Sequence, residues 1–273
     1  MRVATQFHHA EGNAIFFRPL FVLLAALFVT LSTSVEGREL RIGDTAVDVQ
    51  IHVNGDGATF IRVHENETDA GFVGRRIVAL HGGRFIDLAH RGTRDIAFAM
   101  QGALYRIDPN RIFTPEGIVK TLRTNDRTGI ARAHAEVKKF ADAILSIIGA
   151  GQPLIALHNN RGVGFGLSSY ERRGLFASGS GKTLVYRGTT GGQNFYVVTA
   201  HALFEGFLRK GISVVYEPRG YNDGSLSYRY ARDGIPYINV ETVFGQRELQ
   251  MQLAREAADL IMGKMPATEG RAR

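Results

Sequence analysis

Residues 128–160, TGIARAHAEVKKFADAILSIIGAGQPLIALHNN, decide the fold class, because they join the best helix pattern of the chain to a buried strand. Apolar residues recur at helical spacing over residues 128–148, on one helix face: Ile130, Val137, Phe140, Ile144, Leu145 and Ile148. Residues 149–151 and Pro153 end the helix. The continuous apolar run at 154–157 then predicts a strand covered on both faces.

The same alternation extends in both directions from this unit. Strands are predicted at residues 59–63, 84–89, 95–107, 195–199, 212–216 and 235–240, and helices at 70–80, 201–209 and 246–262. Strands that alternate with helices favour a mostly parallel mixed sheet between two helical layers. We therefore expect a single three-layer α/β/α domain.

The N-terminal residues have the pattern of a targeting segment. Residues 20–31, LFVLLAALFVTL, form an apolar run that follows Arg2 and Arg18. Twelve helical residues span about 18 Å, short of a bilayer core of about 30 Å. Small residues follow at Ser32, Ser34 and Gly37, where cleavage could occur. We predict a signal peptide at residues 1–37, with an uncleaved N-terminal membrane anchor as the alternative.

Either form of this segment directs the protein out of the cytoplasm. We expect a periplasmic or secreted protein in which a single globular domain occupies residues 38–265 and a flexible tail occupies residues 266–273. A cell wall or envelope is then the setting in which the domain works.

Composition excludes several classes of protein. The chain has 273 residues, of which 44% are hydrophobic and 22% charged, so disorder, collagen and coiled coil are excluded. It contains no Cys, which excludes a disulfide scaffold, Cys-ligated zinc, iron–sulfur clusters and a thiol nucleophile. Any metal must therefore be held by His and carboxylate side chains.

The net charge of +7 indicates a preference for anions. The predicted leader contains two basic and two acidic residues, so the excess belongs to the rest of the chain. Arg residues are dispersed, with short pairs such as Arg75-Arg76, which argues against a nucleic-acid partner. Attraction of anionic substrates or of an anionic envelope polymer such as peptidoglycan is the favoured interpretation.

Three His and carboxylate features follow predicted strands, where open α/β sheets place their ligands. They are the H-x-x-E motif of His64 and Glu67, the single His158, and Glu241. Two His and one Glu form a catalytic zinc shell with an open position for water, and a further carboxylate can take the proton of that water. The alternative for H-x-x-E is a polar turn whose acids favour a helix N-terminus.

In this order, the features resemble the zinc carboxypeptidase superfamily, which includes the succinylglutamate desuccinylase/aspartoacylase deacylases. Residues 108–113, DPNRIF, are similar to the D-x-N-R-x-F motif of that family. Gly224-Ser225 and the residues up to Glu241 resemble the segment that carries the catalytic Glu in pancreatic-type carboxypeptidases. The resemblance covers residues 63–241 and implies a zinc-carboxypeptidase/phosphorylase-hydrolase-like fold.

The resemblance also implies a role for each matching residue. His64, Glu67 and His158 become zinc ligands, Glu241 the general base and acid, Asn110 and Arg111 the carboxylate-binding pair, Arg94 or its neighbour Arg91 the group that polarises the scissile carbonyl, and Tyr221 a substrate-binding residue. A guanidinium grips a carboxylate through two hydrogen bonds, which suits Arg111 to its role. The alternative for Arg111 is a structural ion pair with Asp108 or Glu116.

Two functions are consistent with these features. The first is a zinc-dependent amide hydrolase, carboxypeptidase-like or N-acyl-amino-acid deacylase-like, whose substrate is a small peptide or acyl amino acid with a free carboxylate. A cell-wall peptide meets that description. The second is a non-catalytic envelope module that keeps the fold and binds carboxylate-bearing peptides.

Overall fold

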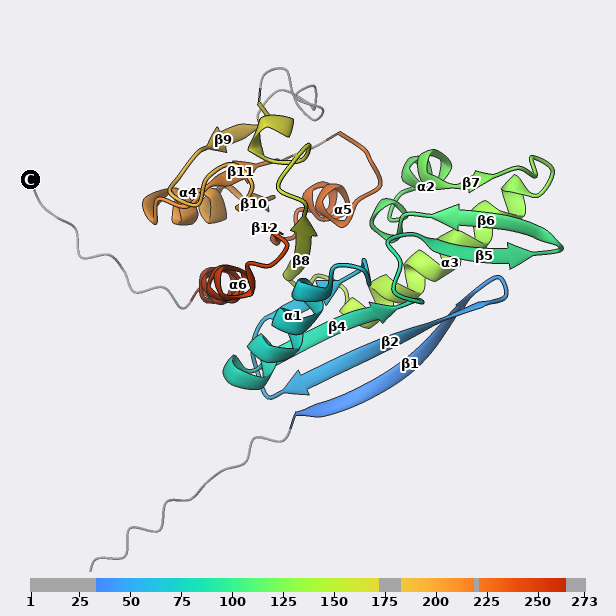
Figure 1. Ribbon diagram of the computed structural model, residues 1–273, viewed down its shortest axis with the longest axis horizontal. Coiled ribbons are helices and arrows are strands. Elements are labelled where there is room, and N and C mark those ends of the chain that lie inside the picture. The colour runs from blue at the N-terminus through green and yellow to red at the C-terminus, as the bar shows by residue number, and fades with distance from the viewer. Residues whose placement is uncertain (1–32, 172–182, 219–220, 264–273) are drawn as a thin grey trace, which may run out of the picture. The chain divides into compact units, whose positions relative to one another are not determined.

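The structure of the protein is a computed structural model that describes residues 33–171, 183–218 and 221–263 (Figure 1). These residues belong to one compact unit, Leu31–Arg273. Most of the predicted leader and the whole predicted tail lie outside the described residues, so the boundaries at residues 37 and 265 stay predictions. Within the described ranges, no helix is long and apolar enough to cross a membrane.

A mixed sheet forms the centre of the described residues. Its nine strands lie in the order β1 (Ser34–Ile42), β2 (Thr45–Asn54), β4 (Gly83–Ala89), β3 (Thr59–Arg62), β8 (Leu154–Asn160), β12 (Tyr237–Val243), β10 (Phe195–Val198), β11 (Val214–Tyr216) and β9 (Leu184–Tyr186). The four central strands β4, β3, β8 and β12 are parallel to one another, and antiparallel pairs flank them. The predicted mixed sheet is confirmed.

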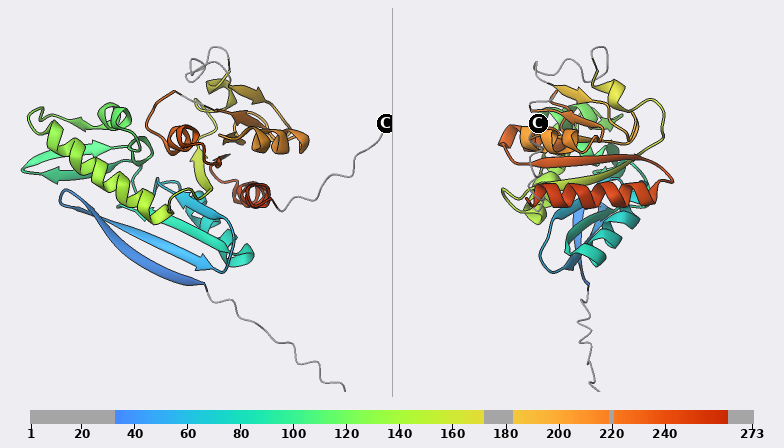
Figure 2. Two further views of the ribbon diagram at one scale, coloured as in Figure 1. Left: turned by 180° about the vertical axis from the view of Figure 1, so that it is seen from behind. Right: turned by 90° about the vertical axis from the view of Figure 1, so that its left-hand side faces the viewer.

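Helices cover both faces of this sheet, which gives the three predicted layers (Figures 1 and 2). One face packs against α1 (Thr68–His81), α4 (His201–Arg209) and α6 (Arg247–Ile261). The other face packs against α3 (Ile130–Ile148), α5 (Leu226–Asp233), α2 (Pro115–Thr121) and a small second sheet of β5 (Ile96–Met100), β6 (Ala103–Ile107) and β7 (Arg123–Thr124). Short 3-10 helices occupy Pro109–Arg111 and Leu167–Ser169.

Helix α3 and strand β8 form as residues 128–160 predict. Four of the predicted apolar positions, Val137, Phe140, Ile144 and Ile148, are buried in the core, while Leu145 is partly buried. The helix ends at Gly149, whose φ of 98° favours glycine and whose N–H donates to the carbonyl of Leu145. Every residue of β8 is buried, as the continuous apolar run indicates.

Two details of the predicted elements are wrong. The strand predicted at residues 95–107 is the hairpin of β5 and β6, because Gln101 and Gly102 turn the chain with positive φ values of 53° and 81°. His158 and Glu241 do not follow their strands but lie inside β8 and β12, each two residues before the strand ends. The side chain of Glu241 still alternates onto the face shared with Tyr237 and Asn239.

The edge strand β1 lies outside the predicted elements, and it begins within the predicted leader. Its residues Ser34–Gly37 pair with β2, and its side chains are almost all exposed. An exposed edge strand needs no apolar alternation, so SVEGRELRI carries little strand signal. Strand β2 does alternate, with Val47, Val49 and Ile51 buried.

Gly224 brings the start of α5 against the segment that carries Arg111. The glycine has a φ of 80°, and a Cβ atom on it would lie 2.4 Å from the carbonyl oxygen of Arg111. The N–H of Phe113 donates to the carbonyl of Gly224 at 2.9 Å, and Ser225 caps α5 by accepting from the N–H of Tyr228. The backbone on both sides of Arg111 is thereby fixed next to α5.

Candidate metal centre

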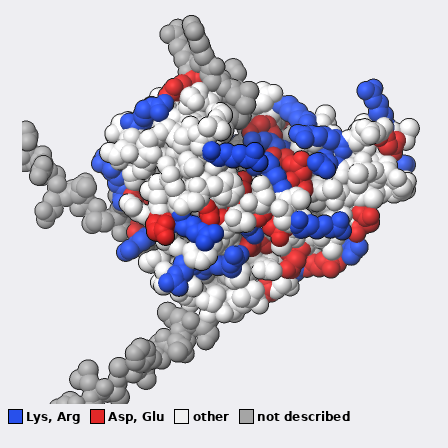
Figure 3. Space-filling view, in the orientation of Figure 1, with Lys and Arg blue, Asp and Glu red and all other residues white. Residues whose placement is uncertain are grey.

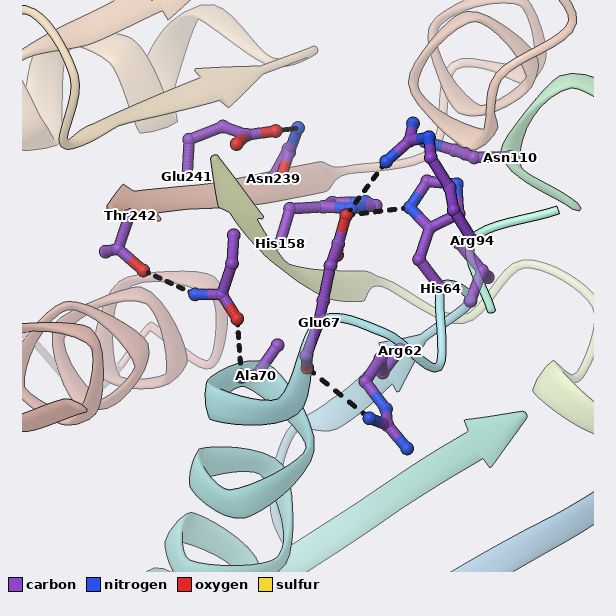
Figure 4. A network of polar contacts seen from close by, with 12 residues as sticks. Arg62, His64, Glu67, Ala70, Arg94, Asn110, His158, Asn239, Glu241 and Thr242 are labelled. Carbon is purple, nitrogen blue, oxygen red and sulfur yellow. Dashed lines mark hydrogen bonds and ion pairs between the residues drawn. The ribbon is translucent and has the colours of Figure 1, made fainter. Parts of the chain in front are cut away.

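Three of the residues predicted as metal ligands converge in the structure. Ligand atoms of His64, Glu67 and His158 all lie within 4.8 Å of one another, and the three side chains are buried. His64 Nδ1 is 2.9 Å from Glu67 Oε1, and His158 Nδ1 is 3.0 Å from Glu67 Oε2. Figure 4 shows the carboxylate of Glu67 between the two rings. His64 lies two residues after β3, Glu67 is the N-cap residue of α1, and His158 lies within β8.

Asp108 determines which nitrogen of His64 faces Glu67. Its Oδ1 lies 2.8 Å from His64 Nε2 and accepts the N–H of Asn110, while its Oδ2 accepts from Arg94 at 3.2 Å. Burial opposes ionisation of Asp108, but the hydrogen bond and charge of His64, together with Arg94, hold its pKa well below the usual range. His64 therefore donates from Nε2, and its Nδ1 points at the carboxylate of Glu67.

A cation fits between these atoms. An unprotonated Nδ1 and a carboxylate are both acceptors, so a proton or a metal ion must lie between them. In the metal-free chain a proton can do so: burial lowers the pKa of His64, but the charges of Glu67 and Asp108 outweigh it and raise that pKa to about 9. Two imidazole nitrogens and one carboxylate are zinc donors, and a carboxylate on the outer nitrogen is the usual support of a metal-bound His.

The support from Asp108 can be tested by substitution. Asp108→Asn should weaken zinc binding by about 10- to 100-fold, because it replaces the negatively charged acceptor of His64 Nε2 with a neutral amide. Competition with a chromophoric chelator measures the affinity. Asp126→Asn, in a surface turn closed by Thr128, is the matched control and should keep the wild-type affinity. Equal zinc affinities for both variants would contradict the assigned support.

Arg94 lies beside this cluster. Its Nη1 is 3.2 Å from Glu67 Oε1, and it lines the pocket next to the metal centre (Figure 4). Burial lowers the pKa of Arg94, but the charges of Asp108 and Glu67 outweigh it and raise that pKa above its usual value. Arg91, the neighbour that the sequence left as an alternative, does not line this pocket.

Glu241 is adjacent to the metal cluster in the sheet. It is the register partner of His158 in the parallel pair of β12 and β8, so both side chains lie on the same sheet face. Glu241 is buried, and its Oε1 accepts from Asn239 Nδ2 at 3.0 Å. Burial raises the pKa of Glu241, although the charge of His158 opposes the shift.

A buried amide network holds His158 from the opposite sheet face. Asn159 Oδ1 accepts the N–H of Ala70 at the start of α1, and its Nδ2 donates to Thr242 and to Gln250 at 3.2 Å each. Gln250 in turn donates to the carbonyl of His158 at 2.9 Å. The network ties β8, β12, α1 and α6 together directly behind the site, which fixes the backbone that carries the ligands.

A pocket of about 470 Å³ opens beside the metal cluster and contains the predicted substrate-binding pair. Asn110 and Arg111 both line it, next to Glu241. Arg111 Nη1 is 3.4 Å from Asp223, so its ion-pair partner among the described residues is neither Asp108 nor Glu116. The pocket wall thus presents a guanidinium that already forms an ion pair with a carboxylate, that of Asp223.

Tyr221 is the predicted site residue that the structure does not bring to this pocket. Its side chain is half exposed, and Lys120 Nζ donates to its hydroxyl at 2.9 Å. The same ammonium lies 4.1 Å from the centre of its ring. A role for Tyr221 in substrate binding stays a prediction.

Glu217 is a pocket residue that the sequence analysis did not select. It follows β11 directly, and its buried side chain accepts from Ser227 Oγ at 3.3 Å. Burial and the negative charge of Asp223 raise the pKa of Glu217 to about 7, although Ser227 and Arg111 oppose the shift. Glu217 follows the strand predicted at residues 212–216, just as His64 follows the strand predicted at 59–63. A search for polar residues directly after predicted strands would therefore have selected it.

The raised pKa of Glu217 makes stability depend on pH. The unfolded carboxyl loses its proton near pH 4.5 and the folded one near pH 7, so the free energy of unfolding should fall as pH rises through that window. Glu217→Gln removes this effect. It should raise the free energy of unfolding by about 2–3 kcal/mol at pH 8 and change it little near pH 5, where wild-type Glu217 is protonated in the fold.

Urea unfolding at the two pH values measures this difference. Glu248→Gln, an exposed residue of α6, is the matched control, and because it keeps Glu217 its stability should fall from pH 5 to pH 8 as that of the wild type does. A stability gain for Glu217→Gln that is equal at pH 5 and pH 8 would contradict a desolvated carboxyl at this position.

The charged surface does not form a basic stripe on the face seen in Figure 3. Lys and Arg side chains alternate with Asp and Glu side chains across that face, and both kinds border the hollow near its centre. This distribution agrees with the dispersed Arg residues of the sequence. The pocket lining also contains charges of both signs, with Arg94 and Arg111 beside Glu217 and Asp223.

Fold and site together define a mixed α/β protein with a buried His–Glu–His cluster beside a charged pocket. No protein-family model and no curated protein sequence matches the chain. Solved structures that resemble its fold include proteins named as an aspartoacylase family protein, as succinylglutamate desuccinylases and as an ectoine utilization protein.

Three of these structures illustrate the extent of the likeness. An aspartoacylase family protein from Mesorhizobium loti is 12% identical, with a TM-score of 0.40 over 89% of this chain and 70% of its own. A succinylglutamate desuccinylase/aspartoacylase from Rhodobacter sphaeroides is 12% identical, with a TM-score of 0.42 over 84% and 65%. The product-bound ectoine utilization protein EutE (DoeB) from Ruegeria pomeroyi is 14% identical, with a TM-score of 0.44 over 90% and 72%.

Proposed function

We propose that this protein is an exported, zinc-dependent amide hydrolase that cleaves a small peptide or acyl amino acid with a free carboxylate. The observation that carries the proposal is the convergence of His64, Glu67 and His158 on one point, with Glu241 as the register partner of His158. Two His and one Glu can hold zinc with a position left open for water, and the separate buried carboxylate can take the proton of that water.

In the proposed reaction, Glu241 moves the proton. When zinc is bound, it supplies Lewis-acid activation of water and of the scissile carbonyl. Glu241 accepts a proton from the attacking water and returns it to the nitrogen of the leaving amine. Asn239 holds the carboxylate of Glu241 through the hydrogen bond at 3.0 Å, and the buried position keeps bulk water from competing for the proton.

Arg94 and Arg111 have separate tasks in the proposed reaction. Arg94 borders the metal cluster and polarises the scissile carbonyl as negative charge develops on its oxygen. Arg111 binds the carboxylate of the substrate, which takes the place of Asp223 at the guanidinium. Asn110 lies next to Arg111 on the pocket wall and contributes a directional hydrogen bond.

The compartment follows from the leader pattern and the charge. An apolar run after Arg2 and Arg18 supports export to the periplasm or beyond, and a net charge of +7 supports attraction to an anionic polymer. Cell-wall peptides carry free carboxylates and lie outside the cytoplasm. They are therefore the substrate that best matches both the leader pattern and the positive net charge. Digestion of purified peptidoglycan fragments, followed by mass spectrometry of the products, tests this part of the proposal.

Hydrolysis itself can be tested on the zinc-loaded protein. A panel of N-acyl amino acids and dipeptides should yield free amine, and removal of the metal with a chelator should stop the release. Amine release is quantified by a fluorogenic amine reagent. Absence of release from the whole panel by a zinc-loaded, folded protein would contradict the proposal.

Recognition of the carboxylate by Arg111 gives a specific expectation. Arg111→Gln should lower kcat/KM by about 10- to 100-fold on a substrate with a free carboxylate, because a charge-assisted contact contributes about 1.5–3 kcal/mol. The variant should no longer distinguish that substrate from its carboxamide. Arg106→Gln, an exposed residue of β6, is the control. An unchanged preference for the free acid in Arg111→Gln would exclude Arg111 as its receptor.

A further inference from the structure

Glu217 is the buried carboxyl of the pocket that the proposed reaction leaves without a task. It is 8% exposed and stands at the end of β11, where its N–H donates to the carbonyl of Val198 on β10 at 2.8 Å. Its backbone is therefore held by the sheet, and its side chain lines the same pocket as Glu241. A rigid position on the pocket wall is what a specificity residue requires.

No cation of the described residues neutralises this carboxyl at ion-pair distance. Its hydrogen bond comes from Ser227, a neutral hydroxyl, at 3.3 Å. The nearby Arg111 is paired with Asp223 at 3.4 Å. A buried carboxyl without a positive partner lowers stability, so its place on a pocket wall points to a partner that comes with the ligand.

The sheet register places Glu217 on the same pocket side as a second acceptor, Asn239. Strand β10 lies between β11 and β12, and continuing its pairings puts Glu217 beside Thr199 and Thr199 beside Tyr237. Asn239, two residues along β12, lines the pocket, and its Oδ1 is buried without a hydrogen-bond partner. The wall between Glu217 and Glu241 thus offers an unfilled acceptor, Asn239 Oδ1, to a ligand that brings donors.

An ammonium group matches this wall. It carries three N–H donors and a positive charge, and it complements a carboxylate more strongly than a neutral donor does. In the proposed reaction the α-nitrogen of the leaving amino acid is part of the scissile amide and is therefore uncharged. The carboxylate of that amino acid occupies Arg111. A cation that reaches Glu217 must then belong to the side chain.

We propose that Glu217 selects substrates whose leaving amino acid has a side chain that ends in an ammonium group, as in lysine or another diamino acid. Glu217 directly follows β11, which β10 separates from β12, and it lies several residues from Glu241 in register, so an extended aliphatic chain separates the ammonium from the scissile bond. This orientation of the substrate rests on the proposed function. The recognition of the cation rests on Glu217 itself.

Binding of the product-like amino acids L-lysine and L-norleucine tests the proposal, because they differ in the terminal ammonium. Calorimetric titration of the zinc-loaded full chain at pH 8, where a carboxyl with a pKa of about 7 is ionised, should show lysine bound about 10- to 100-fold more tightly than norleucine. Glu217→Gln should reduce this ratio to within about twofold by weakening lysine alone, and Glu217→Asp should retain part of it.

The matched control is Glu248→Gln, which lies outside the pocket and should keep the wild-type ratio. Equal affinities of the wild type for lysine and norleucine, or an unchanged ratio in Glu217→Gln, would overturn the proposal. Because the readout is binding, it is separate from the proposed function. Selective lysine binding through Glu217 would stand even if no amide were cleaved, and hydrolysis without lysine preference would overturn this inference alone.

Discussion

Glu241→Gln should lower the turnover number by about 10²- to 10⁴-fold while the protein keeps its metal, because this range is what a positioned proton-transfer group contributes. Glutamine has nearly the same shape but cannot accept the proton of the attacking water. Glu241 is buried next to His158 and is held by Asn239, so the substitution removes its chemistry and leaves its packing.

The measurement combines amine release with metal analysis on the same preparation. The substrate is the member of the panel that the wild type cleaves fastest. Glu248→Gln, on the exposed side of α6, should retain wild-type turnover. If Glu241→Gln retains turnover with its metal bound, then proton transfer does not depend on Glu241 and the proposed mechanism is wrong.

Glu67→Gln should weaken zinc binding more than Asp108→Asn does. Glu67 contacts His64, His158 and Arg94 at 2.9, 3.0 and 3.2 Å, so its carboxylate is the centre of the cluster. Removal of groups that merely support a ligand costs about 10- to 100-fold in affinity, and loss of the ligand charge itself should cost more than about 100-fold. The variant should also leave Arg94 without one of its two carboxylate partners.

Zinc affinity from chelator competition measures this effect. Glu65→Gln is the matched control, because Glu65 belongs to the same HENE stretch but its carboxylate accepts the N–H groups of His90 and Gly92. It should bind zinc like the wild type. If Glu65→Gln and Glu67→Gln weaken zinc binding equally, the His–Glu–His cluster is not the metal site.

The central elements of the fold could be predicted from local patterns. In the helix at residues 128–148 and in the strand that follows it, most of the apolar residues that define the pattern are buried in the core. The hairpin at Gln101 and Gly102 and the exposed strand β1 could not be predicted in the same way. Turn conformation and edge pairing depend on neighbours that are distant in the sequence, and exposed strands need no apolar alternation.

The site shows the same division. His64, His158 and Glu241 could be selected because the carboxyl-terminal parts of parallel strands meet at one edge of a sheet. The structure places His64 just after β3 and the other two near the ends of β8 and β12, with His158 in the metal cluster and Glu241 as its register partner. The contact of Asp108 with His64 spans 44 residues, and spacing alone gives no sign of it. Lys120, which holds Tyr221, lies 101 residues before it in the chain, so its influence on that side chain also appears in three dimensions alone.

Metal analysis of the full chain tests the account most directly. Protein purified without chelators, or metal-free protein supplied with zinc, should hold one zinc ion per chain. His158→Ala should hold none, because one of three converging ligands is lost. Folded wild-type protein that takes up no zinc under either condition would contradict the account and would favour the non-catalytic envelope module.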